Sequence, residues 1–180
     1  VNGQAPRLVK PEKMRRLRET RPEAVSLAVR EYLGDSGNEK AFADFLSWLA
    51  REEVMPQIIL YDMEDAARLE ALRRKGVLPW ENVPVLYVLG RYTKTQQSAP
   101  TDLLPFLAPD QPHFGSWMVS AVGRDEAACV SSAALLGGHA RVGFENNLLL
   151  PDGSAAAANA ELVKAVTAII GAARRRTMTA

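Results

Sequence analysis

Apolar positions along the chain follow two different spacings, and these spacings predict the order of its secondary structure. Apolar residues at every second position, or in short unbroken runs, indicate strands, whereas apolar residues three and four positions apart indicate amphipathic helices. Strand-like patterns cover residues 24–32, 56–62, 83–90, 114–122 and 139–145. Helix-like patterns cover residues 39–53, 63–76, 101–107, 124–138 and 159–176. The chain is therefore expected to alternate strands with helices.

The predicted helices have recognisable faces and ends. The helix over 39–53 places four apolar residues on one face, namely Phe42, Phe45, Leu46 and Leu49. The helix over 63–76 carries acids early and bases late, and Gly76 is a suitable stop. The last helix is predicted to bury one face formed by Leu162, Val163, Val166, Ile169 and Ile170.

Alternating strands and helices favour parallel strands joined by right-handed crossovers. Two architectures fit this pattern: an open doubly wound sheet, or a piece of a (β/α)₈ barrel, whose complete form takes roughly 250 residues. The five predicted strands are too few to close such a barrel. Neither G-x-G-x-x-G nor G-x-x-x-x-G-K-[ST] occurs in the sequence, which weakens the nucleotide-binding version of the doubly wound sheet.

Composition narrows the classes of function. Twenty-two basic and twenty-one acidic residues give the 180-residue chain a formal charge of +1, so nothing draws it as a whole to nucleic acid or to an anionic membrane. A single cysteine, Cys129, excludes an intrachain disulfide and fits a reducing compartment. No apolar run approaches the roughly 20 residues that span a bilayer, and residues 1–10 lack the apolar segment of a signal peptide. We expect a cytoplasmic protein that binds neither nucleic acid nor membrane.

The last predicted strand, over 139–145, carries the clearest candidate chemistry. If it alternates regularly, His139, Arg141, Gly143 and Glu145 point to one side, away from the apolar residues between them. Glu145 then ends the strand, and ligands bind at that end in α/β barrels. Gly143 would leave space between the two charged side chains. Two interpretations stay open here: a ligand site, or a buried ion pair that satisfies itself.

Other candidates carry weaker signals. Asp62, at the end of a strand, could serve a ligand, but a carboxylate there more often caps the following helix. Ser26 could face a pocket or be an ordinary core serine. His113 is expected on the surface, and Cys129 is expected to be a packed thiol. Without H-x-H, H-E-x-x-H or paired cysteines, the chain does not hold a complete metal site of its own.

A longer pattern resembles a known family. The segment 137–166, "GGHARVGFENNLLLPDGSAAAANAELVKAV", is similar to the C-terminal signature of the β-keto acid cleavage enzymes. Weaker likenesses occur at "RPEAVSLAV", "PQIILYD" and "GSWMVSAVGRDE". The resemblance implies a (β/α)₈ TIM barrel in which residues 1–180 are the C-terminal part of a single domain, covering about strands four to eight.

The resemblance also implies a reaction and a set of site residues. The family exchanges carbon units between a β-keto acid and acetyl-CoA, which gives acetoacetate and a new CoA thioester. Its zinc is held by two histidines of an H-x-H motif, which has no counterpart in this chain, and by the glutamate that matches Glu145. Arg141 matches a catalytic arginine, and Ser26 aligns with a hydroxyl residue that contacts substrate. Barrels of this type are commonly homo-oligomers, and we expect one here.

Two residues depart from the family pattern. The family's acid after the zinc glutamate is replaced by Asn146, whose amide cannot act as a carboxylate base. Ile59, in "QIIL", stands where relatives carry a glutamate. The chain therefore fits a cleavage enzyme with Asn146 at the base position, or an altered paralogue that binds an acidic metabolite or CoA ester. Without the resemblance, a different barrel enzyme could use Glu145 and Asp62 as its carboxylates.

Overall fold

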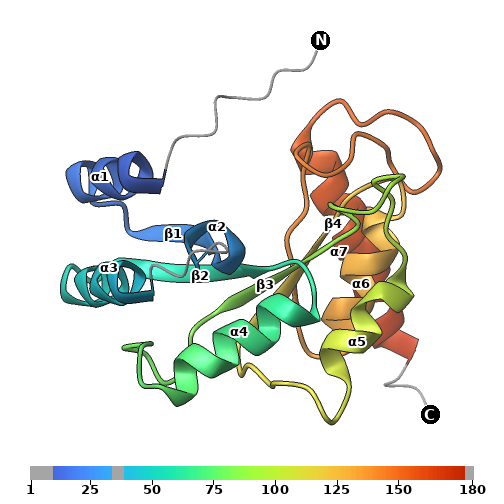
Figure 1. The fold of residues 1–180 in the computed structure, drawn as a ribbon. Coiled ribbons are helices and arrows are strands. Elements are labelled where there is room, and N and C mark those ends of the chain that lie inside the picture. The colour runs from blue at the N-terminus through green and yellow to red at the C-terminus, as the bar shows by residue number, and fades with distance from the viewer. Residues whose placement is uncertain (1–9, 34–38, 177–180) are drawn as a thin grey trace.

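A computed structural model describes residues 10–33 and 39–176, and its centre is one parallel sheet (Figure 1). The strands are β1 (Ala24–Ala28), β2 (Met55–Leu60), β3 (Val85–Leu89), β4 (Trp117–Ala121) and β5 (His139–Ala140). Their spatial order is the sequence order, β1-β2-β3-β4-β5. A doubly wound sheet reverses its strand order at a switch point, and this sheet does not. The fold is therefore consistent with part of a TIM barrel.

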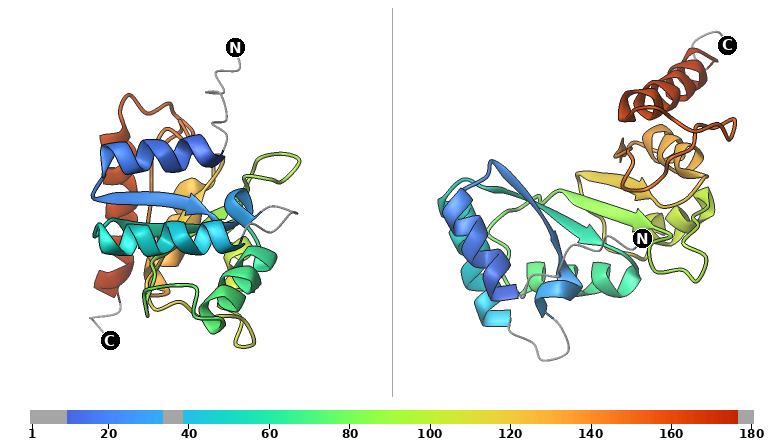
Figure 2. Two further views of the ribbon diagram at one scale, coloured as in Figure 1. Left: turned by 60° about the vertical axis from the view of Figure 1, so that its left-hand side comes forward. Right: turned by 90° about the horizontal axis from the view of Figure 1, so that it is seen from above.

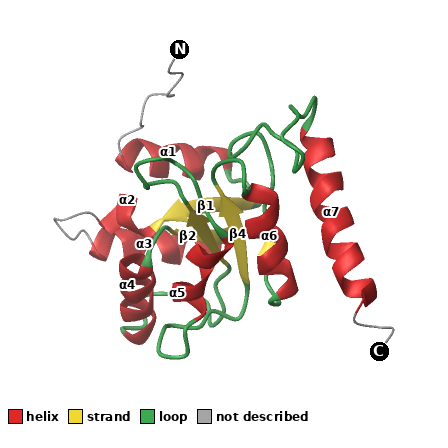
Figure 3. Cartoon of the chain, turned by 90° about the vertical axis from the view of Figure 1, so that its right-hand side faces the viewer, coloured by secondary structure: helices red, strands yellow, loops and turns green. Residues whose placement is uncertain are grey.

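One helix precedes the first strand, and helices follow each strand in turn. They are α1 (Lys10–Thr20), α2 (Val29–Leu33), α3 (Glu39–Arg51), α4 (Met63–Arg74), the 3₁₀ turn η1 (Pro100–Leu103) with α5 (Leu104–Leu107), α6 (Glu126–Leu135) and α7 (Asn159–Arg176). Seen from above, the longer helices succeed one another around the outside of the sheet (Figure 2). The C-terminal helix α7 packs against α6 (Figure 3). No helix among the described residues is long and apolar enough to cross a membrane.

The two faces of the sheet differ in what they bury. Side chains alternate along each strand, and residues in register on neighbouring strands share a face. One set packs under the helices and forms the core, including Leu27, Ile58, Tyr87 and Val119, each at most 2% exposed. The other set, which we call the inner face, includes Ser26, Gln57, Ile59, Val88, Met118 and Ser120. In a barrel this face would be the interior, and its carboxyl end leads to the candidate site.

Two predicted strands end four or five residues earlier than the pattern indicated. The strand expected over 24–32 stops at Ala28. Val29 and Tyr32 are still buried, but they belong to the short helix α2. The strand expected over 139–145 stops at Ala140, and residues 143–146 form a turn. The prediction of which α7 residues are buried was also only partly right. Leu162 and Val166 are buried, whereas Val163 is 49% and Ile169 38% exposed.

Candidate functional site

A cavity of about 90 Å³ lies where the strands β2 to β5 end. Its apolar wall consists of Ile59, Tyr61, Val88 and Val122, and its polar wall of Arg91, Ser120, Arg141, Glu145 and Asn146. These residues come from the carboxyl ends of four strands and the segments that follow them. Ligands of parallel α/β folds bind at that end.

The sheet register explains why these side chains meet. Val88 on β3 lies in register with Ser120 on β4. The next strand continues this level, because Val119 is in register with Ala140 and Arg141 N–H donates to the Val119 carbonyl at 2.9 Å. Ser120 and Arg141 therefore share the inner face. Burial raises the pKa of Tyr61, whose side chain lines the cavity, to about 12, so its phenol stays protonated well above neutral pH.

The turn after β5 presents Glu145 and Asn146 to the cavity. Asn146 N–H donates to the Gly143 carbonyl at 2.9 Å, which closes the turn. The Asn146 carbonyl accepts from Gly123 N–H at 3.1 Å, which ties the turn to the loop after β4. Glu145 thus reaches the cavity from a turn. Regular alternation had predicted that it would lie at the end of a strand, and this prediction is wrong.

Arg141 and Glu145 form an ion pair on the cavity wall. Arg141 donates an Nη2–H to Glu145 Oε2 at 2.5 Å, and the two side chains are 37% and 73% exposed. The alternative interpretation was a buried ion pair. The two residues do pair, but the pair is not buried. Both charged groups remain accessible to a ligand.

Gly143 does not provide the open space that was predicted between these charges. A Cβ at this position would lie 3.2 Å from Asn159 Oδ1. The same oxygen accepts a hydrogen bond from Phe144 N–H at 2.8 Å. Gly143 therefore permits the close approach of Asn159, at the start of α7, which holds the turn from its other side.

Two sequence candidates lie elsewhere. Ser26 is on the inner face of β1, where its hydroxyl donates to Gln57 Oε1 at 3.2 Å, and it is not among the residues that line the cavity. Asp62 caps α4, since its Oδ1 accepts from Asp65 N–H at 3.0 Å, and it also pairs with Arg30. The preferred interpretation of Asp62 as a cap is confirmed. A pair of working carboxylates at Glu145 and Asp62 is not formed in this arrangement.

The remaining candidates behave as ordinary structural residues. His113 is exposed in the loop before β4, as expected, and Cys129 is fully buried, where desolvation raises the pKa of its thiol. Within residues 10–33 and 39–176, no three His, Cys, Asp or Glu side chains come together in a way that could hold a metal ion. Glu145 alone could supply only one ligand.

Two residues of this region escaped the sequence reasoning. Arg91 follows β3 and brings a second guanidinium to the cavity, and it takes part in none of the ion pairs among the described residues. Its position directly after the strand "VLYVLG" was a usable signal. Glu126, in the first turn of α6, accepts hydrogen bonds from the turn itself. A glutamate at a helix start is usually a surface residue that complements the dipole, so its burial had no local signal.

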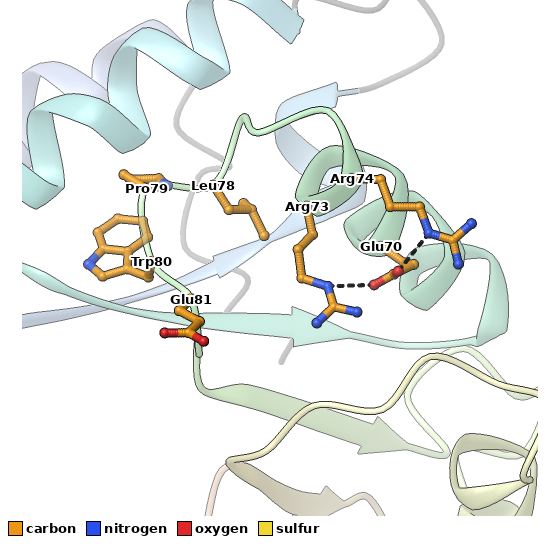
Figure 4. A pocket seen from close by; sticks show the side chains of 7 residues that line it. All are labelled: Glu70, Arg73, Arg74, Leu78, Pro79, Trp80 and Glu81. Atoms are coloured by element: carbon orange, nitrogen blue, oxygen red, sulfur yellow. Dashed lines mark hydrogen bonds and ion pairs between the residues drawn. The ribbon is translucent and has the colours of Figure 1, made fainter.

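A larger hollow of about 410 Å³ lies before the start of β3 (Figure 4). Leu78, Pro79, Trp80 and Glu81 form one side of it, and the end of α4 forms the other. Its two arginines, Arg73 and Arg74, both bind Glu70, at 2.7 and 2.8 Å. This hollow lies at the amino ends of the strands and both of its arginines are paired, whereas Arg91 of the smaller cavity takes part in no ion pair among the described residues. The smaller cavity is therefore the stronger candidate.

Comparison with known proteins finds relatives among β-keto acid cleavage enzymes. The chain is 30% identical over 128 residues to a 3-keto-5-aminohexanoate cleavage enzyme of Fusobacterium nucleatum, covering 71% of this chain and 45% of that protein. It is 32% identical over 130 residues to the enzyme of the same name from Acetoanaerobium sticklandii, covering 71% and 46%. A 3-oxoadipate:acetyl-CoA acetyltransferase of Cupriavidus necator is 28% identical over 137 residues, covering 70% and 46%. The chain therefore spans about half the length of these relatives.

The family profile extends over more of the chain than any of these pairwise matches. The beta-keto acid cleavage enzyme profile matches residues 2–180, which include every residue of the cavity wall. The relatives named above are enzymes by their names. The chain supplies a parallel sheet whose strands lie in sequence order, with an arginine and a glutamate on a cavity at its carboxyl edge. It belongs to the beta-keto acid cleavage enzyme family.

Proposed function

We propose that residues 1–180 form the C-terminal strands of a (β/α)₈ barrel, and that the cavity at their carboxyl ends is part of an active site. There, carbon units would be exchanged between a β-keto acid and acetyl-CoA, giving acetoacetate and a new CoA thioester. The observation that carries this proposal is the placement of Arg141, Glu145 and Asn146 on one cavity wall. These are the residues that the family resemblance selects.

The donor chemistry of the site fits one ligand of a zinc ion. Glu145 has an exposed carboxylate on the cavity, and a carboxylate oxygen is an accepted zinc ligand. A site needs at least three protein ligands, so we propose that the others are the two histidines of an H-x-H motif that lies outside these 180 residues. Zinc, when bound, would polarise the keto oxygen and stabilise the negative charge that develops there.

The chain's own cations would hold the acidic substrate. Arg141 and Arg91 bring two guanidinium groups to a small cavity, and a guanidinium binds carboxylates through two parallel hydrogen bonds. Arg141 would also fix the Glu145 carboxylate, to which it already donates at 2.5 Å. Ile59, Val88 and Val122 would exclude water from the reacting carbons.

A second function remains because of the base position. Among the residues that line the cavity, Glu145 is the sole carboxylate, and it is already paired with Arg141. Asn146 offers an amide and Ile59 a hydrocarbon, and neither removes a proton. These two residues favour the alternative of an altered paralogue that binds an acidic metabolite or CoA ester without turning it over.

Turnover and binding can be separated in one experiment. The intact protein is incubated with zinc, acetyl-CoA and a panel of β-keto acids, and acetoacetate is measured, while calorimetry reports binding of the same compounds. We expect acetoacetate from the wild type and a loss of about 100-fold or more in Glu145→Gln, because the amide is a poor substitute for a zinc-bound carboxylate. Binding without acetoacetate would identify the paralogue, and neither binding nor turnover would overturn both functions.

A further inference from the structure

A buried glutamate behind the cavity has no role in the chemistry described above. Glu126 begins α6 and is 1% exposed. None of the ion pairs found among the described residues includes it. An ionised carboxylate buried without a cation is costly unless hydrogen bonds compensate it. Its hydrogen-bond partners therefore show what it does.

Those partners all belong to the two loops that border the cavity. Gly143 N–H and Asn146 Nδ2–H both donate to Glu126 Oε1, each at 3.1 Å. Glu126 N–H in turn donates to the Gly123 carbonyl at 3.1 Å, and Gly123 N–H donates to the Asn146 carbonyl at 3.1 Å. The loop after β4, the start of α6 and the turn after β5 are thereby joined in a closed ring of hydrogen bonds.

This ring determines where Arg141 and Glu145 lie. Arg141 precedes the turn and Glu145 belongs to it. The turn binds Glu126 through its Gly143 N–H and its Asn146 side chain. Both groups that approach Glu126 Oε1 are donors, so the oxygen must be an acceptor. A carboxylate at position 146 would place two acceptor groups about as close as the present donor and acceptor, and like charges at such contact are unfavourable.

We propose that Glu126 is a positioning residue of the candidate site: it holds the Gly143–Asn146 turn in place and requires an amide, not a carboxylate, at position 146. The departure of Asn146 from the family pattern is then coupled to Glu126 and is not an isolated loss. The catalytic consequence rests on the proposed function, whereas the coupling between the two side chains does not.

A double-mutant cycle in the intact protein tests the coupling. The variants are Glu126→Gln, Asn146→Asp and the two together, and the midpoint of thermal unfolding, Tm, is measured for each. We expect Asn146→Asp to lower Tm by roughly 4–8 °C in the wild type, because it buries an unfavourable contact. In the Glu126→Gln background, the same substitution should cost less than about half as much, because the introduced amide can donate to the new carboxylate.

Asn159→Asp is the matched control. It makes the same change of side chain against the same turn, but the introduced aspartate keeps the oxygen that accepts from Phe144 N–H. We expect its effect on Tm to be equal in the wild type and in the Glu126→Gln background. An equal cost of Asn146→Asp in both backgrounds would overturn the proposed coupling.

Activity separates positioning from stability alone. If Glu126 positions the turn, the kcat of the double variant should be about tenfold or more above that of Asn146→Asp. A tenfold gain corresponds to about 1.4 kcal/mol of restored interaction. Recovery of Tm with kcat still at the Asn146→Asp level would show a merely structural role and contradict the positioning. If neither the wild type nor any variant forms acetoacetate, the proposed cleavage activity fails, and the Tm cycle still decides the coupling.

Discussion

At the scale of single residues, the site depends on side chains that contribute little to stability. The Arg141–Glu145 pair is well exposed, and such pairs are worth about 0–1 kcal/mol of folding free energy. Their place on the cavity is therefore better explained by ligand binding than by folding. Glu126 is the opposite case, since it is buried and holds the turn that carries them.

Replacement of Arg141 separates these two contributions. We expect Arg141→Ala to change the free energy of unfolding by less than about 1 kcal/mol, because the pair is exposed. Its kcat/KM for β-keto acid cleavage should fall by about 100-fold or more, because a positioned cation at the reacting centre is lost. Arg141→Lys is the control that keeps charge but loses the two-pronged geometry. A large loss of stability with unchanged kcat/KM would contradict the assignment.

Glu126 predicts a pH dependence of stability. Burial raises the pKa of this carboxyl above its ordinary value of 4.5, against the opposing hydrogen bonds from Gly143, Asn146 and Asn147. Between the unfolded and the folded pKa, the folded state binds more protons, so stability should fall as pH rises through that window. Comparison of Tm from about pH 4 to about pH 8 should show a steeper fall in the wild type than in Glu126→Gln. Identical slopes would argue that Glu126 is not desolvated as described.

At the scale of elements, a charged cluster fixes the segments that follow two neighbouring strands. Asp62 fixes the start of α4 through Asp65 N–H, and Arg30, from α2, pairs with both Asp62 and Asp65. Although partial burial acts against it, these hydrogen bonds and the Arg30 guanidinium lower the pKa of Asp62. The cluster joins the segments that follow β1 and β2.

Substitutions at Asp62 should affect folding but not the cavity. Asp62→Ala is expected to cost about 1–2 kcal/mol of unfolding free energy, since it removes the helix cap. Asp62→Asn keeps an oxygen for Asp65 N–H and should cost less, with the remaining loss due to the Arg30 pair. Urea denaturation measures both. An equal cost would assign the stabilisation to the ion pair and not to the cap.

The sequence predicted most elements but not where two strands end. Apolar runs marked all five strands, because each buries one face under helices. The apolar residues of 29–32 continue the pattern of β1 yet form α2, since their burial is set by packing against the neighbouring helices. The alternation after Ala140 likewise continued into a turn whose shape depends on Glu126 and Asn159. These partners are 15 or more positions away in sequence, so local patterns could not reveal them.

At the scale of the whole molecule, the sheet has two strands with one described neighbour each. Within residues 10–33 and 39–176, β1 pairs only with β2, and β5 only with β4. Ser26 and Gln57 on the inner face are not covered by the helices that bury the opposite face. A closed barrel would pair both edges and enclose this face.

The proposed barrel therefore predicts the behaviour of the 180-residue chain expressed by itself. Strand edges without partners favour association between chains, so we expect oligomers or aggregates by light scattering and a low Tm. The same residues joined to the remaining strands of a barrel should give a defined assembly and a higher Tm. A stable monomer with cooperative unfolding from the 180-residue chain would contradict the proposed architecture.

The most direct test of the proposed function follows carbon from acetyl-CoA into product. When the acyl group of a β-keto acid is transferred to CoA, atom balance requires the acetyl group to join the remaining CH₂–COO⁻ unit. The intact protein is supplied with zinc, an unlabelled β-keto acid and acetyl-CoA labelled with ¹³C in both acetyl carbons. We predict acetoacetate that carries both labelled carbons, together with an unlabelled new acyl-CoA. Acetoacetate without label, or no acetoacetate while acetyl-CoA persists unchanged, would contradict the account.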